Sequence, residues 1–315
     1  MRPIGSHLLR AHLLLRRQKW LFGTFSGLRP LGDVAEKFHI NVSKEDAELR
    51  LDQLLAKHIP EMSRRKARKF IEIGGVFIDS KRVKVSGRVP KLGQKVTIHI
   101  GGAVGALAKP NAFALDILFE DEHIVVINKP SGLITAPTPE SDRGNLKYLL
   151  ETRADKPCQI FVVHRLDKDT SGILVMAKSN EANIKLSEGF KKHIFKRRYL
   201  AVVKGHLEEA TLKVSSPIKK KSATTHLKRL RLLKNATEIE AVLDTGRTHQ
   251  IRLHCLSIGH EVVGDSLYGT KFSPKPPQMA LHATHLGIQH PMTGEELSFD
   301  ADYPAALNQW VEQLT

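Results

Sequence analysis

The hydrophobic positions between residues 51 and 100 follow first a helical and then a strand period. Four leucine and isoleucine residues within 51–59 recur at helical spacing, which predicts a first helix. Ser63, a residue type that caps helix N-termini, precedes a second helical pattern over 64–73. Short apolar runs at 76–78 and 96–100 then predict two strands. The pattern therefore indicates a small unit of two helices and a short sheet.

After residue 113 the pattern is that of a larger unit with many strands. Apolar and alternating runs predict strands within 116–128, 173–176, 195–203, 239–243 and 280–299. Helical spacing predicts helices within 144–152, 180–191 and 303–314. The stretch 101–112 between the two units is rich in Gly, Ala and Pro and carries one charge, a composition typical of a linker.

These patterns predict four segments. Residues 1–45 form a basic extension that we expect to be poorly ordered, 46–102 a small domain, 103–112 a linker and 113–315 the main domain. The first thirty residues contain six Arg or Lys and no acid. That composition fits an organelle transit segment, a flexible arm for RNA or an upstream start codon, and the sequence does not separate these alternatives.

Charge points to a polyanionic partner. The 315 residues include 49 Lys or Arg against 33 Asp or Glu, a net charge of +16 and a pI near 9.8. Residues 48–100 hold thirteen of the bases and five of the acids. This excess favours RNA or DNA as partner ahead of an anionic membrane. Two cysteines without a CxxC pair fit a reducing cytoplasm, and no apolar stretch is long enough to span a membrane.

The second predicted helix concentrates this charge on one face. Its apolar residues recur on one side, and its basic residues on the other side are Arg64, Arg65, Lys66, Arg68 and Lys69. A basic helix over a small sheet suits a phosphate backbone, so Arg64, Arg65, Arg68 and Lys69 are candidate RNA-binding residues. A solvated helix face is the alternative for an isolated charge run.

The chemistry is concentrated in the stretch Phe161 to Lys178. An apolar run at 161–163, interpreted as the end of a buried strand, leads into a charged loop at 164–169, and a second apolar run follows the turn. A loop between two strands is a usual place for reactive side chains. Asp167 and Asp169 are rival acids, because the spacing directs both to the same side. From composition alone, a polar hairpin with a turn-capping Asp fits equally well.

Several motifs in this order resemble one enzyme family. The central loop, HRLDKDTSG at 164–172, resembles the signature HRLDxxTSG of the RluA-type pseudouridine synthases. Further likenesses are EDEHIVVINKPSGL at 120–133, FKRRYLAVV at 195–203, GRTHQIRLH at 246–254 and GDSLYG at 264–269. The stretch RLDQLL followed by SRRKARKFIEIGGVFIDSKRV, within 50–83, resembles an S4-type RNA-binding domain.

The resemblance implies a fold and an activity. The fold class expected is α+β: a small N-terminal S4-like RNA-binding domain, and a catalytic domain with a mixed, largely antiparallel sheet. The activity expected is the isomerisation of uridine in RNA to pseudouridine. In the family, the residues matching Asp167, Tyr199 and Arg252 are catalytic: the acid, an aromatic ring that covers the base, and a cation that keeps the acid ionised.

The resemblance also implies contacts with RNA. The arginine matching Arg165 enters the helical stack when the base flips out, and we count His164 and Lys129 among the RNA-contacting residues. The reaction needs no redox step or hydrolysis, so we expect no metal and no organic cofactor. The candidate histidines, such as His249 and His254, lack an established metal-ligand spacing.

The substrate is less well defined than the reaction. Family members with an S4 domain mostly modify large-subunit ribosomal RNA, which we favour, and some relatives act on transfer RNA. The alternative from another class is a non-catalytic RNA-binding or ribosome-assembly protein. We expect a cytoplasmic monomer with RNA as partner and no membrane partner. The basic segment 217–234 is interpreted as an RNA-facing hairpin or a flexible loop.

Overall fold

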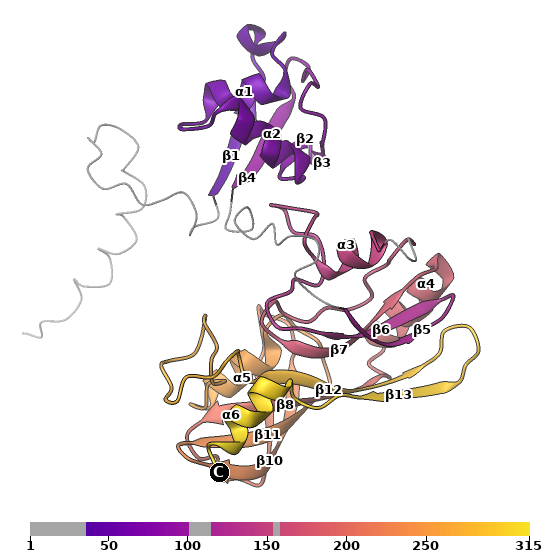
Figure 1. Ribbon diagram of the computed structural model, residues 1–315, viewed down its shortest axis with the longest axis vertical. Coiled ribbons are helices and arrows are strands. Elements are labelled where there is room, and N and C mark those ends of the chain that lie inside the picture. The colour runs from indigo at the N-terminus through magenta and orange to yellow at the C-terminus, as the bar shows by residue number, and fades with distance from the viewer. Residues whose placement is uncertain (1–35, 101–114, 154–157) are drawn as a thin grey trace, which may run out of the picture.

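The computed structural model describes residues 36–100, 115–153 and 158–315, which form two units with separate sheets (Figure 1). The small unit has an antiparallel sheet in the order β1-β4-β2-β3, covered by two helices. Its elements are β1 (Glu36–Asn41), a 3-10 turn (Lys44–Asp46), α1 (Leu51–His58), α2 (Arg64–Glu72), β2 (Val76–Ile78), β3 (Lys81–Arg82) and β4 (Lys95–Ile100).

The small unit folds as its hydrophobic pattern predicts. Ser63 caps α2, because its hydroxyl oxygen accepts a hydrogen bond from the backbone N–H of Lys66 at 3.2 Å. Ala67, Phe70 and Ile71 of α2 are buried against the sheet, while the basic residues of the helix face outward. Both predicted helices and both predicted strands are present.

The N-terminal boundary of this unit differs from the prediction. Strand β1 lies inside 1–45, the range that we expected to be poorly ordered, and it pairs along its whole length with β4. Its alternation is weak, since only Ile40 of the strand is fully buried, so the sequence pattern gave little signal. The prediction is therefore wrong for residues 36–41, and residues 1–35 lie outside the described part of the chain.

The large unit is built on one nine-stranded sheet. Its order is β5-β6-β7-β12-β8-β11-β10-β9, with β13 paired to β12. Only β7 and β12 pair in parallel, so the sheet is mixed and largely antiparallel, as expected. The strands are β5 (Asp116–Glu120), β6 (Ile124–Lys129), β7 (Ser171–Ala177), β8 (Lys196–Lys204), β9 (Thr211–Ser215), β10 (Thr224–Leu233), β11 (Ala236–Leu243), β12 (Leu281–Gln289) and β13 (Glu296–Asp300).

Helices cover both faces of this sheet. They are α3 (Leu146–Glu151), α4 (Asn180–Lys191), α5 (Gln250–Ser257) and α6 (Ala305–Glu312). Alternate residues of β6 explain the arrangement: Val125 and Ile127 pack in the core that includes α3 and α5, whereas Ile124 and Val126 pack in the core beneath α4. Helix α6 packs on the sheet through a further cluster that contains Trp310.

Two segments differ from their interpretation. The apolar run 161–163 is not a strand: only Phe161 pairs, through two backbone hydrogen bonds with Ala177 of 2.8 and 3.1 Å. The basic segment 217–234 is not a flexible loop, because most of it forms strand β10 between β9 and β11. Its pairing on both sides makes it part of an ordered antiparallel ribbon.

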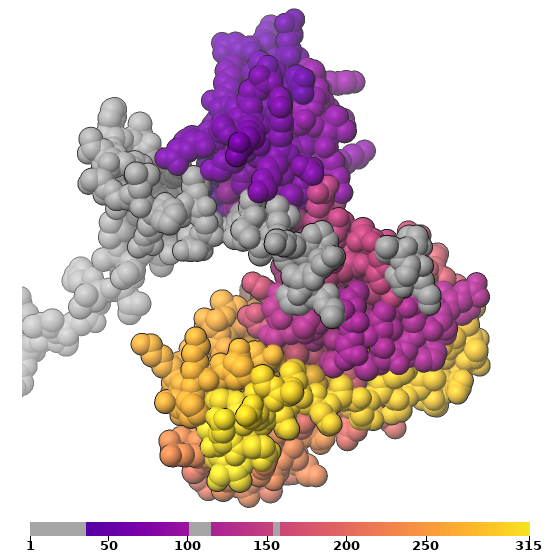
Figure 2. Space-filling view, in the orientation of Figure 1, coloured from indigo at the N-terminus to yellow at the C-terminus, as the bar shows by residue number. Residues whose placement is uncertain are grey.

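The small unit contacts the large one through the loop that precedes α3 (Figure 2). The backbone N–H of Asp142 donates to the carbonyl oxygen of Ile73 at 3.0 Å. The Arg82 guanidinium donates to the carbonyl oxygen of Thr138 at 2.6 Å, and Lys84 pairs with the Asp142 carboxylate at 2.6 Å.

Among the described residues, no helix is both long and apolar enough to cross a membrane.

Candidate active site

The charged loop is presented at the start of a fully buried strand. All seven residues of β7 are buried, and the loop 164–170 precedes it at the point where β7 meets β12. Gly172 makes this close approach possible: a Cβ there would lie 2.3 Å from the carbonyl oxygen of Ala283, and its φ is +113°. The TSG turn of the motif therefore sets where the loop leaves the sheet.

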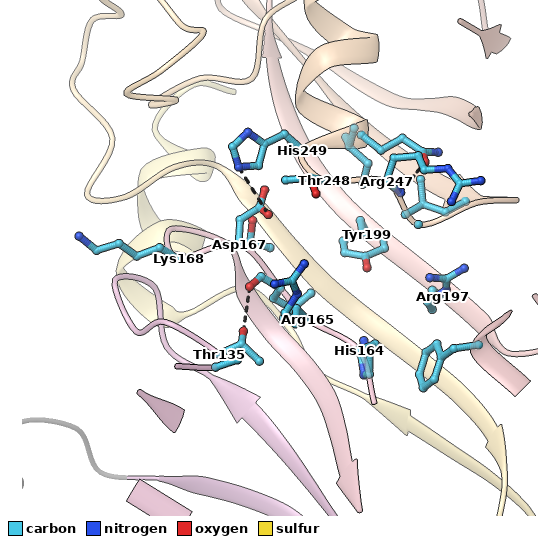
Figure 3. A pocket seen from close by; sticks show the side chains of 18 of the residues that line it. Thr135, His164, Arg165, Asp167, Lys168, Arg197, Tyr199, Arg247, Thr248 and His249 are labelled. Carbon is cyan, nitrogen blue, oxygen red and sulfur yellow. Dashed lines mark hydrogen bonds and ion pairs between the residues drawn. The ribbon is translucent and has the colours of Figure 1, made fainter. Parts of the chain in front are cut away.

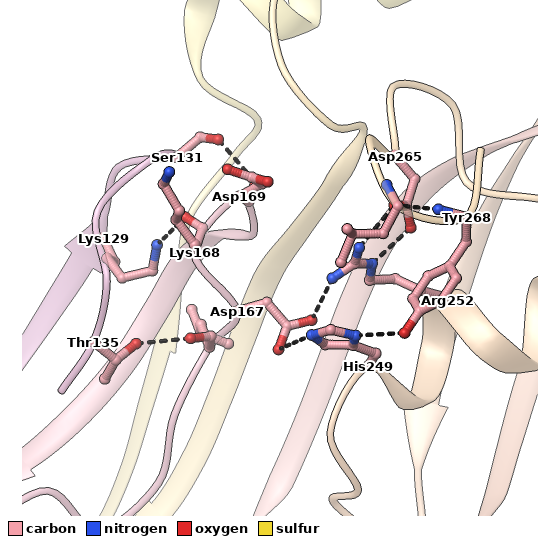
Figure 4. A network of polar contacts seen from close by, with 12 residues as sticks. Lys129, Ser131, Thr135, Asp167, Lys168, Asp169, His249, Arg252, Asp265 and Tyr268 are labelled. Carbon is pink, nitrogen blue, oxygen red and sulfur yellow. Dashed lines mark hydrogen bonds and ion pairs between the residues drawn. The ribbon is translucent and has the colours of Figure 1, made fainter. Parts of the chain in front are cut away.

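Side chains of the preceding segment hold this loop by its backbone (Figure 4). The Lys129 ammonium donates to the carbonyl oxygens of Pro130, Leu133 and Lys168 at 2.9, 2.9 and 3.1 Å. The Thr135 hydroxyl donates to the carbonyl oxygen of Leu166 at 2.8 Å. The Ser131 hydroxyl donates to the carbonyl oxygen of Asp169, also at 2.8 Å. These bonds fix the loop backbone, and the side chain of Asp167 is directed toward Arg252 and His249 (Figure 4).

The prediction that Lys129 contacts RNA is wrong. Its side chain is fully buried, with 0% exposure, and its three donors are used by backbone carbonyls. Burial lowers the pKa of Lys129 to about 7, against the raising effect of the Asp169 and Asp167 charges. A lysine at the end of a strand is usually exposed, and the sequence carries no sign that this one turns inward.

A buried guanidinium meets the central acid. Arg252, 3% exposed on α5, places Nη1 3.2 Å from Oδ2 of Asp167. Its Nε and Nη2 donate to both oxygens of Asp265 at 2.6 and 2.7 Å. Burial opposes the charge of Arg252, yet the hydrogen bonds and charge of Asp265, joined by those of Asp167, raise its pKa above the ordinary value. Arg252 is thus a fixed cation aimed at one oxygen of Asp167.

The second oxygen of Asp167 faces His249. Nε2 of His249 lies 3.8 Å from Oδ1 of Asp167, and its Nδ1 lies 2.9 Å from the hydroxyl oxygen of Tyr268. The Tyr268 ring also lies under the Arg252 guanidinium, at 5.0 Å from Cζ. His249 has a left-handed backbone conformation, with φ 57° and ψ 26°, which is costly for a residue with a Cβ.

Asp167 and Asp169 are separated by the structure, although the sequence spacing left them equivalent. Asp167 is 25% exposed and borders a cleft of about 760 Å³ (Figure 3). The Asp169 side chain is drawn near Ser131, and no hydrogen bond or ion pair joins it to Arg252 in the described part of the chain (Figure 4). The structure therefore brings Asp167, and not its rival, to the guanidinium.

Tyr199 on β8 lines the same cleft (Figure 3). The residue is buried, and burial raises the pKa of its hydroxyl. Arg165 is exposed at the cleft, and no described residue forms a hydrogen bond or ion pair with its guanidinium. Both positions are compatible with the predicted contacts to a flipped nucleotide, which stay predictions.

His164 supports the loop from inside. Its Nε2 accepts the backbone N–H of Val175 at 3.1 Å, and its ring stacks on Phe190 with centroids 4.2 Å apart. Burial lowers the pKa of His164 to about 3, so the imidazole is neutral. An RNA contact by His164 stays a prediction, but its ring already has two partners in the protein.

A buried aspartate binds two of the arginines on the basic face of α2. Asp52 is fully buried, and Arg50, Arg64 and Arg68 surround its carboxylate at 3.3, 3.4 and 2.7 Å. Burial opposes ionisation of Asp52, but these arginines keep its pKa below the ordinary value. Arg64 and Arg68 remain about half exposed, and Arg65 and Lys69 are exposed on the same helix.

Sequence reasoning missed several groups that line the cleft or contact its lining residues. Asp265 and Tyr268 lie in the GDSLYG stretch, and His249 lies in GRTHQIRLH, so the motif letters were visible without their roles. Arg197 also lines the cleft and had no assigned role. In the described part of the chain, no group of three or more His, Cys, Asp or Glu is placed to hold a metal ion.

The fold and the site together define a class of protein. A small unit exposes a basic helix, and a large unit holds an acid, a guanidinium and a tyrosine around one open cleft. The comparisons with known proteins agree. The family model for RNA pseudouridylate synthases matches residues 123–257, which include Asp167, Tyr199 and Arg252, and the model for the S4 domain matches residues 49–96.

Similar proteins extend the match over most of the chain. The chain is 37% identical over 298 residues to a protein of Nitrosomonas europaea named ribosomal large subunit pseudouridine synthase D, covering 85% of this chain and 86% of that one. A protein of the same name from Zymomonas mobilis is 35% identical over 84% of this chain and 93% of its own length. The structure of human RNA pseudouridylate synthase domain containing 1 has a TM-score of 0.51 and 25% identity, over 64% of this chain and 94% of that one.

The chain belongs to the RNA pseudouridine synthase family, and it is an isomerase that acts on uridine in RNA. The family and the fold class expected from the motifs are confirmed.

Proposed function

We propose that this enzyme forms pseudouridine in large-subunit ribosomal RNA and that Asp167 is the carboxylate that acts on the target uridine. The relatives that share most of its length are named for that RNA. One observation supports the role of Asp167 above all others. Its carboxylate lies 3.2 Å from the buried guanidinium of Arg252 at the edge of an open cleft. A cytoplasmic monomer fits this substrate and stays a prediction.

The chemistry requires a charged acid beside the nucleotide. Pseudouridine formation breaks the bond between N1 of uracil and C1′ of ribose, rotates the base and joins C5 to C1′. C5 loses its proton to solvent and N1 gains one, so that the formula is unchanged. A carboxylate can take part as nucleophile or as base only when it is ionised. Arg252 supplies the opposite charge and fixes the orientation of Asp167, and Asp265 in turn fixes Arg252.

The uridine must leave its stack to reach this acid, which costs a few kcal/mol. Arg165 is two residues before Asp167, exposed and without a described partner, so it can enter the space that the base vacates. The Tyr199 ring lines the cleft where the flipped uracil would lie, and an aromatic ring can stack on an unpaired base.

His249 positions the other side of the carboxylate. If the Tyr268 hydroxyl donates to Nδ1, the imidazole carries its proton on Nε2, which faces Oδ1 of Asp167. The separation of 3.8 Å is too long for a hydrogen bond in this state. His249 therefore faces Oδ1 without bonding to it, while Arg252 bonds to Oδ2.

The small unit binds the sugar–phosphate backbone of the RNA through basic side chains. Arg65 and Lys69 are exposed on α2, and Arg64 and Arg68 are held in place by Asp52 while remaining half exposed. Contacts of this kind neutralise phosphates and carry little sequence information. The choice of uridine therefore rests with the cleft and the shape of the RNA around it.

Two measurements test this proposal. Ribosomal RNA transcripts labelled with tritium at C5 of uridine should release tritium when the enzyme is added, because the C5 proton is lost. Pseudouridine mapping of all RNA from a strain that lacks the gene should show the missing sites in large-subunit ribosomal RNA. Missing sites confined to transfer RNA would reject large-subunit ribosomal RNA as the substrate. An unchanged map would reject the proposed function as a whole.

A further inference from the structure

We propose that the Arg197 guanidinium binds a backbone phosphate next to the target uridine. This proposal rests on the function proposed above and extends it to a specific part of the substrate. The Nε atom of Arg197 is buried, and no described residue accepts a hydrogen bond from it. No described carboxylate or carbonyl oxygen pairs with the rest of its guanidinium. Buried donors in folded proteins nearly always have a partner, because leaving one unpaired is costly.

The guanidinium is held in a defined slot. Arg197 lies on β8, two residues before Tyr199, so both side chains project from the same face of the strand into the cleft (Figure 3). On one side, Cζ of Arg197 lies 5.7 Å from the centre of the Phe190 ring. On another side is Gly246, where a Cβ would lie only 3.1 Å from Nη1 of Arg197. The glycine of the GRTHQIRLH motif thus leaves room for this guanidinium.

Three neighbouring arginines already have partners, whereas Arg165, also at the cleft and without a described partner, is assigned above to the space that the base vacates. Arg252 binds Asp265 and Asp167 at 2.6 and 3.2 Å. Arg198 lies next in the chain, and its guanidinium pairs with Glu240 and Asp300 at 3.7 and 3.3 Å. Nε of Arg247 donates to the carbonyl oxygen of Ser222 at 3.1 Å. Arg197 lines the same cleft with its planar donor set unused.

A phosphate fits this group better than the uracil does. The charge of Arg197 adds to the effect of burial in lowering the pKa of His164, and it opposes the raising effect of burial on the pKa of Tyr199. No described acid pairs with this charge. An anion would satisfy the donors and balance this charge, whereas a uracil carbonyl would satisfy donors only. RNA offers one phosphate per nucleotide, and guanidinium binds phosphate with two parallel hydrogen bonds.

Such a contact would anchor the backbone while the base detaches and rotates. The interaction is the same before and during the reaction, so its loss should raise KM more than it lowers kcat. Charge-assisted bonds of this kind correspond to roughly a tenfold to hundredfold change in kcat/KM.

The test uses a synthetic RNA fragment around the mapped uridine in three forms. One has natural phosphates, and the others carry a neutral methylphosphonate on the 5′ or the 3′ side of the uridine. The wild-type enzyme should lose roughly tenfold to hundredfold in kcat/KM on one of the two methylphosphonates. Arg197→Met should show that loss on natural RNA and no further loss on the same methylphosphonate.

The controls separate a phosphate contact from a folding defect. Arg198→Met removes the adjacent, paired arginine and should retain wild-type selectivity among the three RNAs. Arg197→Lys keeps the charge and should recover part of the affinity for natural RNA. Thermal unfolding of each variant shows whether the fold is intact, and the ratio between substrates within one variant does not depend on the active fraction.

The outcomes are distinct. If Arg197→Met loses the same factor on all three RNAs, or if neither methylphosphonate affects the wild type, the phosphate contact is rejected. If the wild type does not modify the natural fragment or full-length ribosomal RNA, the proposed function fails instead.

Discussion

The Asp167 carboxylate has a different neighbour on each oxygen, and the two neighbours make different demands on the sequence. Arg252 is only 3% exposed, and a second acid, Asp265, offsets the cost of burying its charge. His249 needs only a hydroxyl on its far nitrogen, which Tyr268 provides at 2.9 Å. Removing Arg252 and removing His249 should therefore have different effects on catalysis.

The Tyr268 hydroxyl can be tested without disturbing the core. Tyr268→Phe removes one oxygen and frees the tautomer of His249, so we predict a several-fold fall in kcat with KM for RNA unchanged. His249→Gln should reduce kcat further, by up to about hundredfold. His226→Gln is the matched control, since His226 on β10 also pairs with an aspartate, at 2.9 Å, but its side chain is 45% exposed. Equal effects of all three changes would contradict the positioning role.

Lys129 gives a prediction about pH. Burial lowers its pKa to about 7. In the unfolded chain the lysine keeps its proton to about pH 10.4, so above pH 7 the unfolded state binds more protons than the folded state. Compared with Lys129→Met, the wild type should therefore gain free energy of unfolding as pH rises from about 7 to about 10.

Denaturant unfolding of both proteins across that range measures the difference. Below pH 7 the difference should be constant, because both states of the wild type then hold the proton. A difference that stays flat up to pH 10 would show that the three carbonyl partners keep the ammonium charged.

At the scale of elements, strongly patterned segments could be predicted and segments defined by distant partners could not. Helix α4 matches its predicted range, because its apolar period is regular and Ser179 caps it. The strand expected at 161–163 fails, because a short apolar run does not show whether a neighbouring strand is available. Strand β1 was missed for the converse reason: its pairing with β4 outweighs a weak pattern.

The same limit applies to the site. The motif letters predicted that Asp167 and Arg252 would meet, and they do so across 85 residues of sequence. Nothing in the sequence showed that Lys129 turns inward or that Arg197 lacks a partner, because both properties depend on which oxygens surround a side chain in three dimensions.

Helix α2 supplies the prediction at this scale. Lys69→Gln removes one exposed charge from the basic face, and we expect the slope of log affinity against log salt to fall by about 0.7 for a single-stranded contact. The control is Lys185→Gln on α4, an exposed lysine that pairs with Glu181 on its own helix at 3.1 Å. A slope unchanged by Lys69→Gln would place the RNA elsewhere.

For the whole molecule, the contact between the two units lies close to the cleft. Thr138 lines the cleft, and its carbonyl oxygen accepts a hydrogen bond from Arg82 of the small unit. The unit that carries the basic helix therefore touches the rim of this cleft directly. Under the proposed function, this contact would set the position of RNA bound by α2 relative to RNA in the cleft.

Arg82→Ala removes the hydrogen bond between the two units and should make their relative position less defined. We predict a higher KM on a long RNA that reaches both units, and an unchanged KM on a short fragment that fills only the cleft. Steady-state kinetics on the two RNAs measure the difference, and kcat should stay constant on both. Equal changes on the long and the short RNA would mean that Arg82 acts on the cleft alone.

The most direct test of the account compares two neighbouring acids. Tritium release is followed in a single turnover, with enzyme in excess over C5-labelled ribosomal RNA, for the wild type, Asp167→Asn and Asp169→Asn. Asp167→Asn should abolish release while RNA binding persists, and Asp169→Asn should retain a rate within a few-fold of the wild type. Release by Asp167→Asn at the wild-type rate would contradict the assignment of the reaction to the carboxylate beside Arg252.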